Sequence, residues 1–193
     1  FIEANDDANI VYGHHAKDEK ELRKYIQEDR WDELIKHLDV HPGDFVYLPA
    51  GLLHALKKGS IDYEIQQATD ITYRFYDYHR KDAEGNEREL HLEQAIDCLS
   101  YDPKEMENHI HPVVSETAHM KQTVFISNDS FTVTKLEIDG QDTYQSGHYQ
   151  LATIVKGQGK VDNQEVKVGD NFLIPVNCEI KVDGQMTIMM TTK

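Results

Sequence analysis

The chain has 193 residues, of which 39% are apolar and 28% are charged. That length can hold one large or two small domains with buried cores. Twenty basic residues stand against thirty-five acidic residues, which gives a formal net charge of −15 at pH 7 and a pI near 5.0. Such an acidic surface repels nucleic acid and anionic lipid, so we expect neither as a partner.

Two further classes of protein are disfavoured by the composition. No apolar run approaches the length of a membrane span, so no membrane segment is predicted. Cys98 and Cys178 are the two cysteines, too few for a disulfide framework. We therefore expect a soluble, cytoplasmic protein.

The first elements predicted are strands. Phe1 to Ala4 is typical of the end of a strand, residues 5–9 of a turn, and Ile10 to Tyr12 of the following strand. The sequence starts without Met at what is predicted to be a strand end. We therefore expect a further segment to precede Phe1 in the complete protein.

Between Asp18 and Leu38 the hydrophobic period changes. Apolar residues recur at three- and four-residue intervals among charged neighbours, which predicts two short amphipathic helices with a break at Asp29-Arg30. The turn at His41-Pro42-Gly43 then returns the chain to β structure. We expect strands at 44–48, 52–57, 61–68 and 71–78.

The second half of the chain is predicted to be almost entirely β. A turn at Gly85, a helix over 90–99 with Cys98 on its apolar face, and a polar stretch over 102–112 come first. Gly157-Gln158-Gly159 predicts a hairpin turn. Short strands that suit an antiparallel sandwich or barrel are expected at 122–127, 130–138, 149–155, 164–168, 171–174, 178–182 and 186–191.

One motif stands out in residues 43–54. It places Gly43, Pro49, Gly51 and His54 at the intervals G-x5-P-x-G-x2-H, which is the second signature of the cupin barrels. The glycines and the proline shape two turns around a short apolar strand, and a histidine after the second turn can point into a barrel mouth. His54 is therefore the strongest metal-ligand candidate in the chain.

The spacing recurs 126 positions later, from Gly169 to Pro175, but Ile180 stands where the first copy has His54. An internal repeat of this kind predicts two related barrel units, of which the first alone keeps the ligand. Chance similarity is the alternative, because Gly-Asp and Pro are common turn residues.

Glu64 and Arg74 are the next candidates, one in each of two predicted strands. If these strands pair in the barrel that carries His54, an imidazole, a carboxylate and a guanidinium face one cavity. That set suits proton transfer next to a carbonyl. A cross-strand ion pair between Glu64 and Arg74 on a solvated sheet face is the alternative.

Other histidines have simpler explanations. His109-Ile110-His111 with Glu116 imitates the first cupin signature, but the flanking glycines are missing and a solvated linker explains them. His14-His15 are adjacent, so in a strand they point to opposite faces and cannot chelate one ion together. His79-Arg80 offers positive charge to a phosphate, or is a solvated strand end.

These features together carry a resemblance to a known family. The segments 43–54, 64–70, 72–78 and 88–91 together closely resemble the short bacterial form of class I mannose-6-phosphate isomerase, and the resemblance covers nearly the whole chain. Members of that family are zinc-dependent cupins that interconvert mannose 6-phosphate and fructose 6-phosphate by proton transfer through a cis-enediol.

The resemblance implies a mainly β fold of two tandem cupin jelly-roll barrels with a small helical insertion, the first barrel being incomplete. Residues 1–80 would form the later part of the catalytic barrel, with the helical insert at about 18–38. Residues 81–112 would be a helical connection, and 113–193 a second barrel without metal ligands.

The resemblance also assigns roles. It implies that His54 is a zinc ligand, that Arg74 serves the enediolate or its proton transfer, and that Glu64 is an acid/base or a site-shaping carboxylate. It implies one zinc ion, a sugar-phosphate substrate and compatibility with a homodimer.

The family's other zinc ligands, a Gln-x-His pair and a Glu, and its active-site lysine precede the strand with which this chain starts. Because one protein ligand cannot hold zinc in a defined site, we expect this chain by itself to bind metal weakly and to catalyse little or nothing.

Two other function classes stay open at this point. A cupin of this kind can bind a sugar or sugar phosphate without turning it over, or it can be a different metallocupin such as an epimerase or an oxygenase. Zinc dependence together with exchange of the C2 proton of the substrate distinguishes the isomerase from both.

Overall fold

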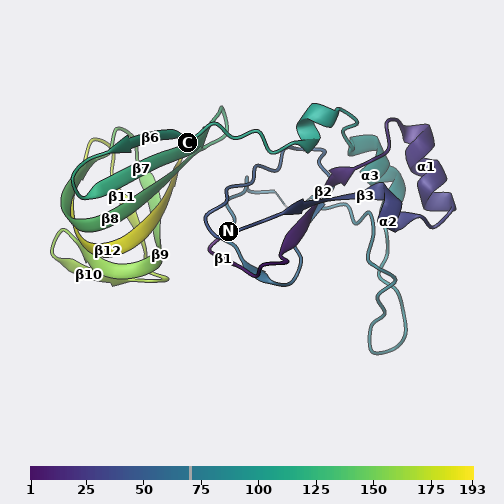
Figure 1. The fold of residues 1–193 in the computed structure, drawn as a ribbon, viewed down its shortest axis with the longest axis horizontal. Helices are drawn as coiled ribbons and strands as arrows, with labels where there is room; N and C mark the ends of the chain where they lie inside the picture. The colour runs from purple at the N-terminus through teal and green to yellow at the C-terminus, as the bar shows by residue number, and fades with distance from the viewer. Residues whose placement is uncertain (70) are drawn as a thin grey trace. The chain divides into compact units, whose positions relative to one another are not determined.

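The computed structural model describes residues 1–69 and 71–193, which form mainly β structure with a few short helices. By their internal contacts they divide into two compact units, drawn in Figure 1. Unit 1 comprises residues 1–62 and 68–109, and unit 2 comprises residues 63–67 and 110–193. Within the described chain, no helix has the length and apolar character needed to cross a membrane.

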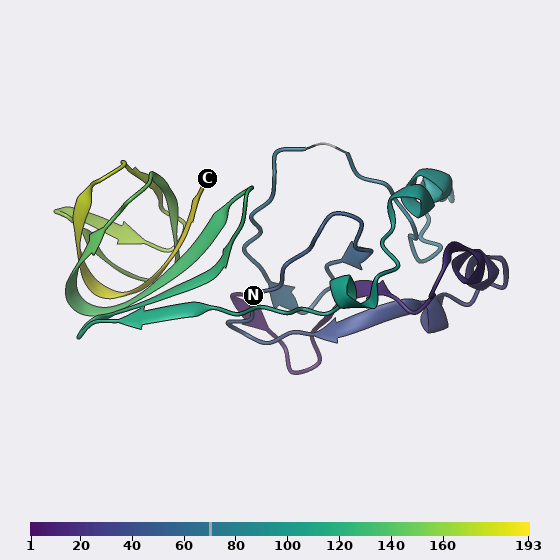
Figure 2. The same cartoon turned by 90° about the horizontal axis from the view of Figure 1, so that it is seen from above.

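Unit 2 is one antiparallel sheet that curls around an apolar interior (Figure 2). Its strand order is β10-β9-β12-β8-β7-β6, and β11 also pairs with β9. The bounds are Val113–Glu116 for β6, Met120–Ser127 for β7, Thr132–Gln145 for β8, Gln150–Val161 for β9, Gln164–Lys167 for β10, Asn171–Ile174 for β11 and Glu179–Thr192 for β12.

The core of unit 2 follows from the alternation of side chains along its long strands. Apolar residues on one face are buried while most of their neighbours along the strand stay in contact with solvent. β12 contributes the largest share of this core, with Ile180, Val182, Met186, Ile188 and Met190. The mainly β structure that the sequence predicts is therefore confirmed for the part of the chain with the strongest strand signals.

In unit 2 the predicted hairpin turn at residues 157–159 and the predicted break between strands 178–182 and 186–191 are wrong. Gly157 and Gly159 lie inside β9, and residues 183–185 continue β12 without a break. A Cβ atom at Gly157 would lie 2.0 Å from the carbonyl oxygen of Gln185, and one at Gly159 would lie 2.3 Å from that of Asp183. The glycines are there because two strand backbones approach each other closely, and not because the chain turns.

Unit 1 has smaller sheets and short helices. In one sheet, β2 (Asn9–His14) lies between β3 (Ile35–Asp39) and β4 (His54–Ala55), and in the other, β1 (Glu3–Ala4) pairs with β5 (Ser60–Ile61). The helices are α1 (Glu19–Gln27), α2 (Trp31–Leu34), α3 (Leu92–Cys98) and the 3-10 helix Pro103–Met106.

Strand β2 separates two apolar clusters, because successive side chains of a strand point to opposite faces. Ile10 and Tyr12 pack with Val40 and Leu52 in one cluster. Val11 belongs to the other cluster, which also contains Leu22, Trp31, Leu34, Phe75 and Ile96. A strand that is buried on both faces is the centre of unit 1.

The helical insertion starts where the sequence provides a cap. The Asp18 carboxylate accepts a hydrogen bond from the Glu21 backbone N–H at 2.8 Å, and the Glu21 carboxylate accepts one from the Lys17 backbone at 2.9 Å. Leu22 behind this cap is fully buried. Asp29, with φ of 54°, breaks the insertion between α1 and α2, as the sequence predicts.

Several elements predicted for unit 1 are replaced. The second helix ends at Leu34, and residues 35–39 form β3 because they pair with β2. Within the described residues, 44–48 and 71–78 form no regular strand, 52–57 keeps the two-residue β4, and 61–68 keeps one residue of β5. Long-range pairing and loop packing override the local strand pattern here.

The close approach of β9 and β12 leads to a stability prediction. We expect Gly157→Ala to lower the free energy of unfolding by about 3 kcal/mol, because it adds a clash with a backbone carbonyl to a left-handed φ of 75°. Gly147→Ala is the control, since a Cβ there meets nothing within 4 Å, and it should cost less than about 0.5 kcal/mol. Urea denaturation of both variants measures this, and equal midpoints would contradict the packing argument.

Candidate active site

The Gly-Asp turn that opens the motif has the same construction in both copies. The φ angles are +95° at Gly43 and +93° at Gly169. In the first copy the Asp44 backbone N–H donates to the His41 carbonyl at 3.1 Å and its carboxylate accepts from the His41 N–H at 2.8 Å. In the second copy Asp170 makes the same two bonds with Lys167, at 3.0 and 2.8 Å. This shared geometry favours a true repeat over chance similarity.

The second turn of the motif differs between the copies in what it touches. Gly51 has φ of 83°, and the equivalent Asn177 has φ of 54°, a conformation that Asn tolerates. A Cβ at Gly51 would lie 2.7 Å from the Cys98 carbonyl oxygen, and the Gly51 carbonyl accepts a hydrogen bond from the Ser100 N–H at 2.9 Å. The first copy therefore needs glycine because its backbone lies against the end of α3.

His54 follows this turn in β4, opposite Tyr12 of β2, and its side chain is exposed. Its Nδ1 lies 3.0 Å from the Leu52 carbonyl oxygen. A carbonyl oxygen accepts but never donates, so Nδ1 carries a proton and the neutral ring keeps a free lone pair on Nε2. Metal-bound histidines are commonly oriented in this way, so the geometry fits His54 as one ligand of a metal ion.

The equivalent residue in unit 2 has a different environment. Ile180 is 4% exposed, pairs with Tyr144 of β8, and packs in the apolar core. The second copy of the motif thus has a core residue where the first copy has a polar side chain in contact with solvent.

Arg74 is held at its backbone by His91. The Arg74 N–H donates to His91 Nδ1 at 3.1 Å, and the His91 N–H donates to the Arg74 carbonyl at 2.8 Å. The half-buried guanidinium donates from Nη1 to the Glu89 carbonyl at 3.0 Å. Its remaining N–H groups have no partner among the described residues, so they are free to bind an oxyanion.

Glu64 belongs to the segment Tyr63–Gln67 of unit 2, whereas His54 and Arg74 belong to unit 1. Its side chain is exposed, and no ion pair joins it to Arg74 in the described chain. The cross-strand ion pair is therefore not present, and no regular strands exist there to form it. The structure leaves the predicted catalytic role of Glu64 as a prediction.

The described residues do not form a complete metal site. Among residues 1–69 and 71–193, no three His, Cys, Asp or Glu side chains come together in a way that would hold a metal ion. The donor set therefore fits zinc at one position, His54, and the described residues do not supply the rest.

Sequence patterns did not reveal a buried carboxylate that comes shortly after Arg74 in the chain. Asp77 is 5% exposed, with Oδ1 2.5 Å from Arg80 Nη2 and Oδ2 2.7 Å from Arg88 Nε. Hydrogen bonds from Arg88 and Arg80 hold the pKa of this carboxyl well below its usual range, although burial opposes them. Asp77 thereby holds the loop that continues to Arg88. Arg80 is hydrogen-bonded to Asp77 and is not available to bind a phosphate through Nη2. No local sequence pattern predicts that Asp77, Arg80 and Arg88 come together.

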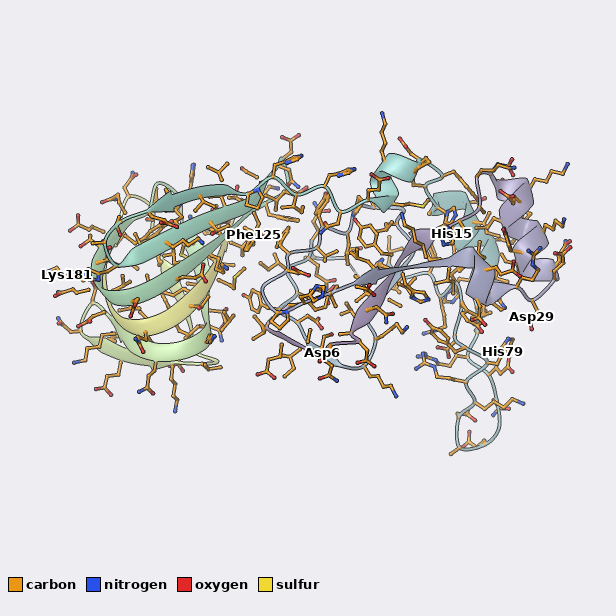
Figure 3. All side chains as sticks on the ribbon, viewed as in Figure 1. Asp6, His15, Asp29, His79, Phe125 and Lys181 are labelled. Atoms are coloured by element: carbon orange, nitrogen blue, oxygen red, sulfur yellow. The ribbon has the colours of Figure 1, made fainter. Side chains whose placement is uncertain are left out.

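The other histidines occupy the places expected of surface and core residues. His14 is 3% exposed and the adjacent His15 is exposed, as expected of neighbours in a strand that point to opposite faces. His79 is exposed beside Asp29, with Nε2 3.4 Å from Oδ1 (Figure 3). Cys98, predicted to pack on the apolar face of its helix, is instead exposed.

His14 is another buried titratable group of unit 1. Its Nε2 donates to the Ser100 carbonyl at 3.0 Å, whereas Nδ1 has no hydrogen-bond partner among the described residues. Burial lowers the pKa of His14, and the bond to Ser100 only partly opposes that effect. The ring is therefore neutral in the folded protein and contributes to packing rather than to chemistry.

Comparison with known proteins shows what this chain is similar to. A family model described as the cupin domain of mannose-6-phosphate isomerase matches residues 121–193. The mannose-6-phosphate isomerase of Streptococcus mutans is 36% identical over 97% of this chain, and mannose-6-phosphate isomerase ManA of Bacillus subtilis is 38% identical over 95% of it.

The structural comparison covers the whole chain. The crystal structure of the mannose 6-phosphate isomerase from Bacillus subtilis superposes with a TM-score of 0.90 at 30% identity, over 100% of this chain and 62% of that one. Over nearly its whole length, this chain is similar to mannose-6-phosphate isomerases. It spans 60% of the length of the two curated isomerases compared above. The family resemblance of the sequence is confirmed.

The buried His14 predicts how the stability of this protein depends on pH. In the unfolded chain His14 gains a proton near its ordinary pKa of about 6.5, whereas the folded state resists protonation. The His14 contribution is therefore fully present above that pH and is lost as pH falls below it. We expect His14→Gln, which keeps a donor for Ser100, to reduce this loss between pH 7.5 and about 5.

Urea denaturation at several pH values measures the effect as the difference between wild type and variant. His15→Gln is the matched control, because an exposed ring should leave the pH dependence of stability unchanged. A difference between wild type and His14→Gln that stays constant over this pH range would contradict the assignment.

Proposed function

We propose that the complete protein to which this chain belongs interconverts mannose 6-phosphate and fructose 6-phosphate. The observation that carries the proposal is the fold match to a mannose 6-phosphate isomerase at a TM-score of 0.90 over the full chain. It is supported by 35 to 38% identity to three relatives that bear this name or are described as probable members. Since the chain spans less than two thirds of these relatives, the activity is proposed for the complete protein.

We propose His54 as one protein ligand of a zinc ion. A free Nε2 lone pair on an exposed ring, with Nδ1 fixed by the Leu52 carbonyl, supports this role. The remaining ligands are proposed to lie in the part of the complete protein that this chain does not span. When bound, such an ion would act as a Lewis acid toward a sugar oxygen.

Arg74 is proposed to stabilise negative charge on the reacting sugar. The isomerisation moves a proton between two adjacent carbons and leaves charge on the oxygen of an enediolate intermediate. His91 fixes the Arg74 backbone, and the Glu89 carbonyl holds Nη1 of its guanidinium, whose remaining N–H groups are organised in advance to bind that oxygen. Glu64 is proposed as the carboxylate that moves the proton or shapes the site.

The remaining expectations belong to the same proposal. A sugar phosphate is the small-molecule partner, and neither nucleic acid nor a membrane is a partner. Residues 1–80 serve as the later part of the catalytic barrel, 81–112 as the connection and 113–193 as the second barrel. A cytoplasmic location and a homodimer are likewise proposed.

Substitutions at His54 and Arg74 test the site in the full-length protein. We expect Arg74→Ala to lower kcat for mannose 6-phosphate by about 100-fold or more, because a donor aimed at developing charge is lost. Arg74→Lys should recover only part of the rate, since a point charge does not replace the planar fork. Steady-state assays of isomerisation measure both variants.

His54→Ala should lower bound zinc, measured by metal analysis of the purified protein, together with kcat. His15→Ala is the control, because it removes an equally exposed imidazole from the end of β2 and should change neither quantity. Normal isomerase activity after either His54→Ala or Arg74→Ala would overturn the site assignment. Sugar-phosphate binding without exchange of the C2 proton would favour a non-catalytic binding protein, whereas dependence on iron and oxygen would favour an oxygenase.

A further inference from the structure

The segment Tyr63–Gln67 belongs by its contacts to unit 2, although the residues on both sides of it belong to unit 1. It carries Glu64, the proposed carboxylate of the site. The side-chain contacts of this segment therefore decide what holds Glu64 in place.

Tyr63 begins a directed chain of hydrogen bonds. Its hydroxyl lies 2.9 Å from Thr153 Oγ1, which lies 2.6 Å from Asn171 Oδ1, and Asn171 Nδ2 donates to the Gly169 carbonyl at 2.8 Å. The Gly169 carbonyl only accepts, so Asn171 presents its NH2 group there and its oxygen to Thr153. The Thr153 hydroxyl gives its single proton to Asn171, and hence Tyr63 donates to Thr153.

This chain of bonds ends on a rigid part of unit 2. Thr153 and Asn171 are directly opposite each other on β9 and β11. Gly169, which opens the second copy of the motif, donates its backbone N–H to the Ile154 carbonyl at 2.9 Å. The Gly169 turn of the second motif copy is thus the end of the hydrogen-bond chain that holds Tyr63.

The other end of the segment is also attached. Gln67 Nε2 donates to Ser130 Oγ at 2.8 Å, in the turn between β7 and β8. The Ser130 backbone N–H is fixed in turn by the Asn128 side chain at 2.9 Å. Two side-chain hydrogen bonds, four residues apart, therefore fasten the segment to unit 2.

Burial alternates along the start of the segment. Tyr63 and Ile65 are half-buried, whereas Glu64 and Gln66 are exposed. In an extended chain neighbouring side chains point to opposite sides. The side that carries Tyr63 is thus fastened to unit 2, and the exposed Glu64 carboxylate is accessible to a substrate.

We propose that the hydrogen-bond chain Tyr63–Thr153–Asn171 positions Glu64 for the isomerisation, an inference that rests on the proposed function. A carboxylate on an irregular segment samples many positions, and proton transfer needs it within hydrogen-bond reach of the carbon-bound proton. Anchoring the adjacent residue to the β9–β11 ladder reduces that freedom before substrate binds. Tyr63, Thr153 and Asn171 are positioning residues, and unit 2 supports the reaction without a metal ligand of its own.

The experiment compares Tyr63→Phe, Thr153→Val and the double variant in the full-length isomerase. We expect each single change to lower kcat by about five- to tenfold, the effect of one lost hydrogen bond, with little change in KM. The double variant should be no slower than either single variant, because both changes break the same bond. Tyr149→Phe is the matched control, an exposed tyrosine in the same unit that should leave kcat unchanged.

A second comparison separates positioning from general loosening of the fold. In a Glu64→Gln background, Tyr63→Phe should have no further effect on kcat, because the group that it positions is already disabled. An equal loss of rate in both backgrounds overturns the inference. An active wild type whose kcat is unaffected by Tyr63→Phe also overturns it, while the proposed function stands. A full-length wild type that does not isomerise mannose 6-phosphate overturns the proposed function itself.

Discussion

Unit 1 depends on one set of backbone contacts, in which β2, the end of α3 and the motif turn meet. The Gly51 carbonyl accepts from the Ser100 N–H at 2.9 Å, the Ser100 carbonyl accepts from His14 Nε2 at 3.0 Å, and the Gly13 N–H donates to the Leu53 carbonyl at 2.7 Å. No side chain fits at Gly51, since a Cβ there would meet the Cys98 carbonyl at 2.7 Å. This close contact fixes the turn, and the turn presents His54 to solvent with a defined tautomer.

The two copies of the motif show how one backbone frame serves two purposes. Both copies form the same Gly-Asp turn, with φ angles of +95° and +93°, because that turn requires only glycine and a short carboxylate. The role of the residue after the second turn depends on its surroundings. In unit 2 the long strands β8, β9 and β12 close over an apolar core that takes up Ile180, whereas in unit 1 the short β4 leaves His54 exposed. The equivalent positions therefore differ in burial, with a core residue in unit 2 and an exposed imidazole in unit 1.

Unit 2 has Ile180 where unit 1 has His54, but it also makes the hydrogen bonds that hold the segment Tyr63–Gln67. Its β9–β11 ladder and the Gly169 turn hold Tyr63, and the β7–β8 turn holds Gln67, so the segment with Glu64 is fixed at both ends. The residues that hold this segment all belong to unit 2. A barrel without chemistry of its own can be retained because it reduces the conformational freedom of a group that needs it.

The sequence by itself determined the features that are encoded locally: the break at Asp29, the Gly-Asp turns, the strand-rich second half, and the motif that contributes to the family resemblance and singles out His54. The tertiary structure decided what depends on distant partners. Residues 35–39 became a strand by pairing with β2, and Gly157 and Gly159 lie inside β9 because the backbone of β12 approaches them. Asp77 became a buried partner of two arginines, and Glu64 joined unit 2. A pattern over a few neighbouring residues reports turns, caps and periodicity, but pairing and close approach depend on residues tens of positions away that no local pattern contains.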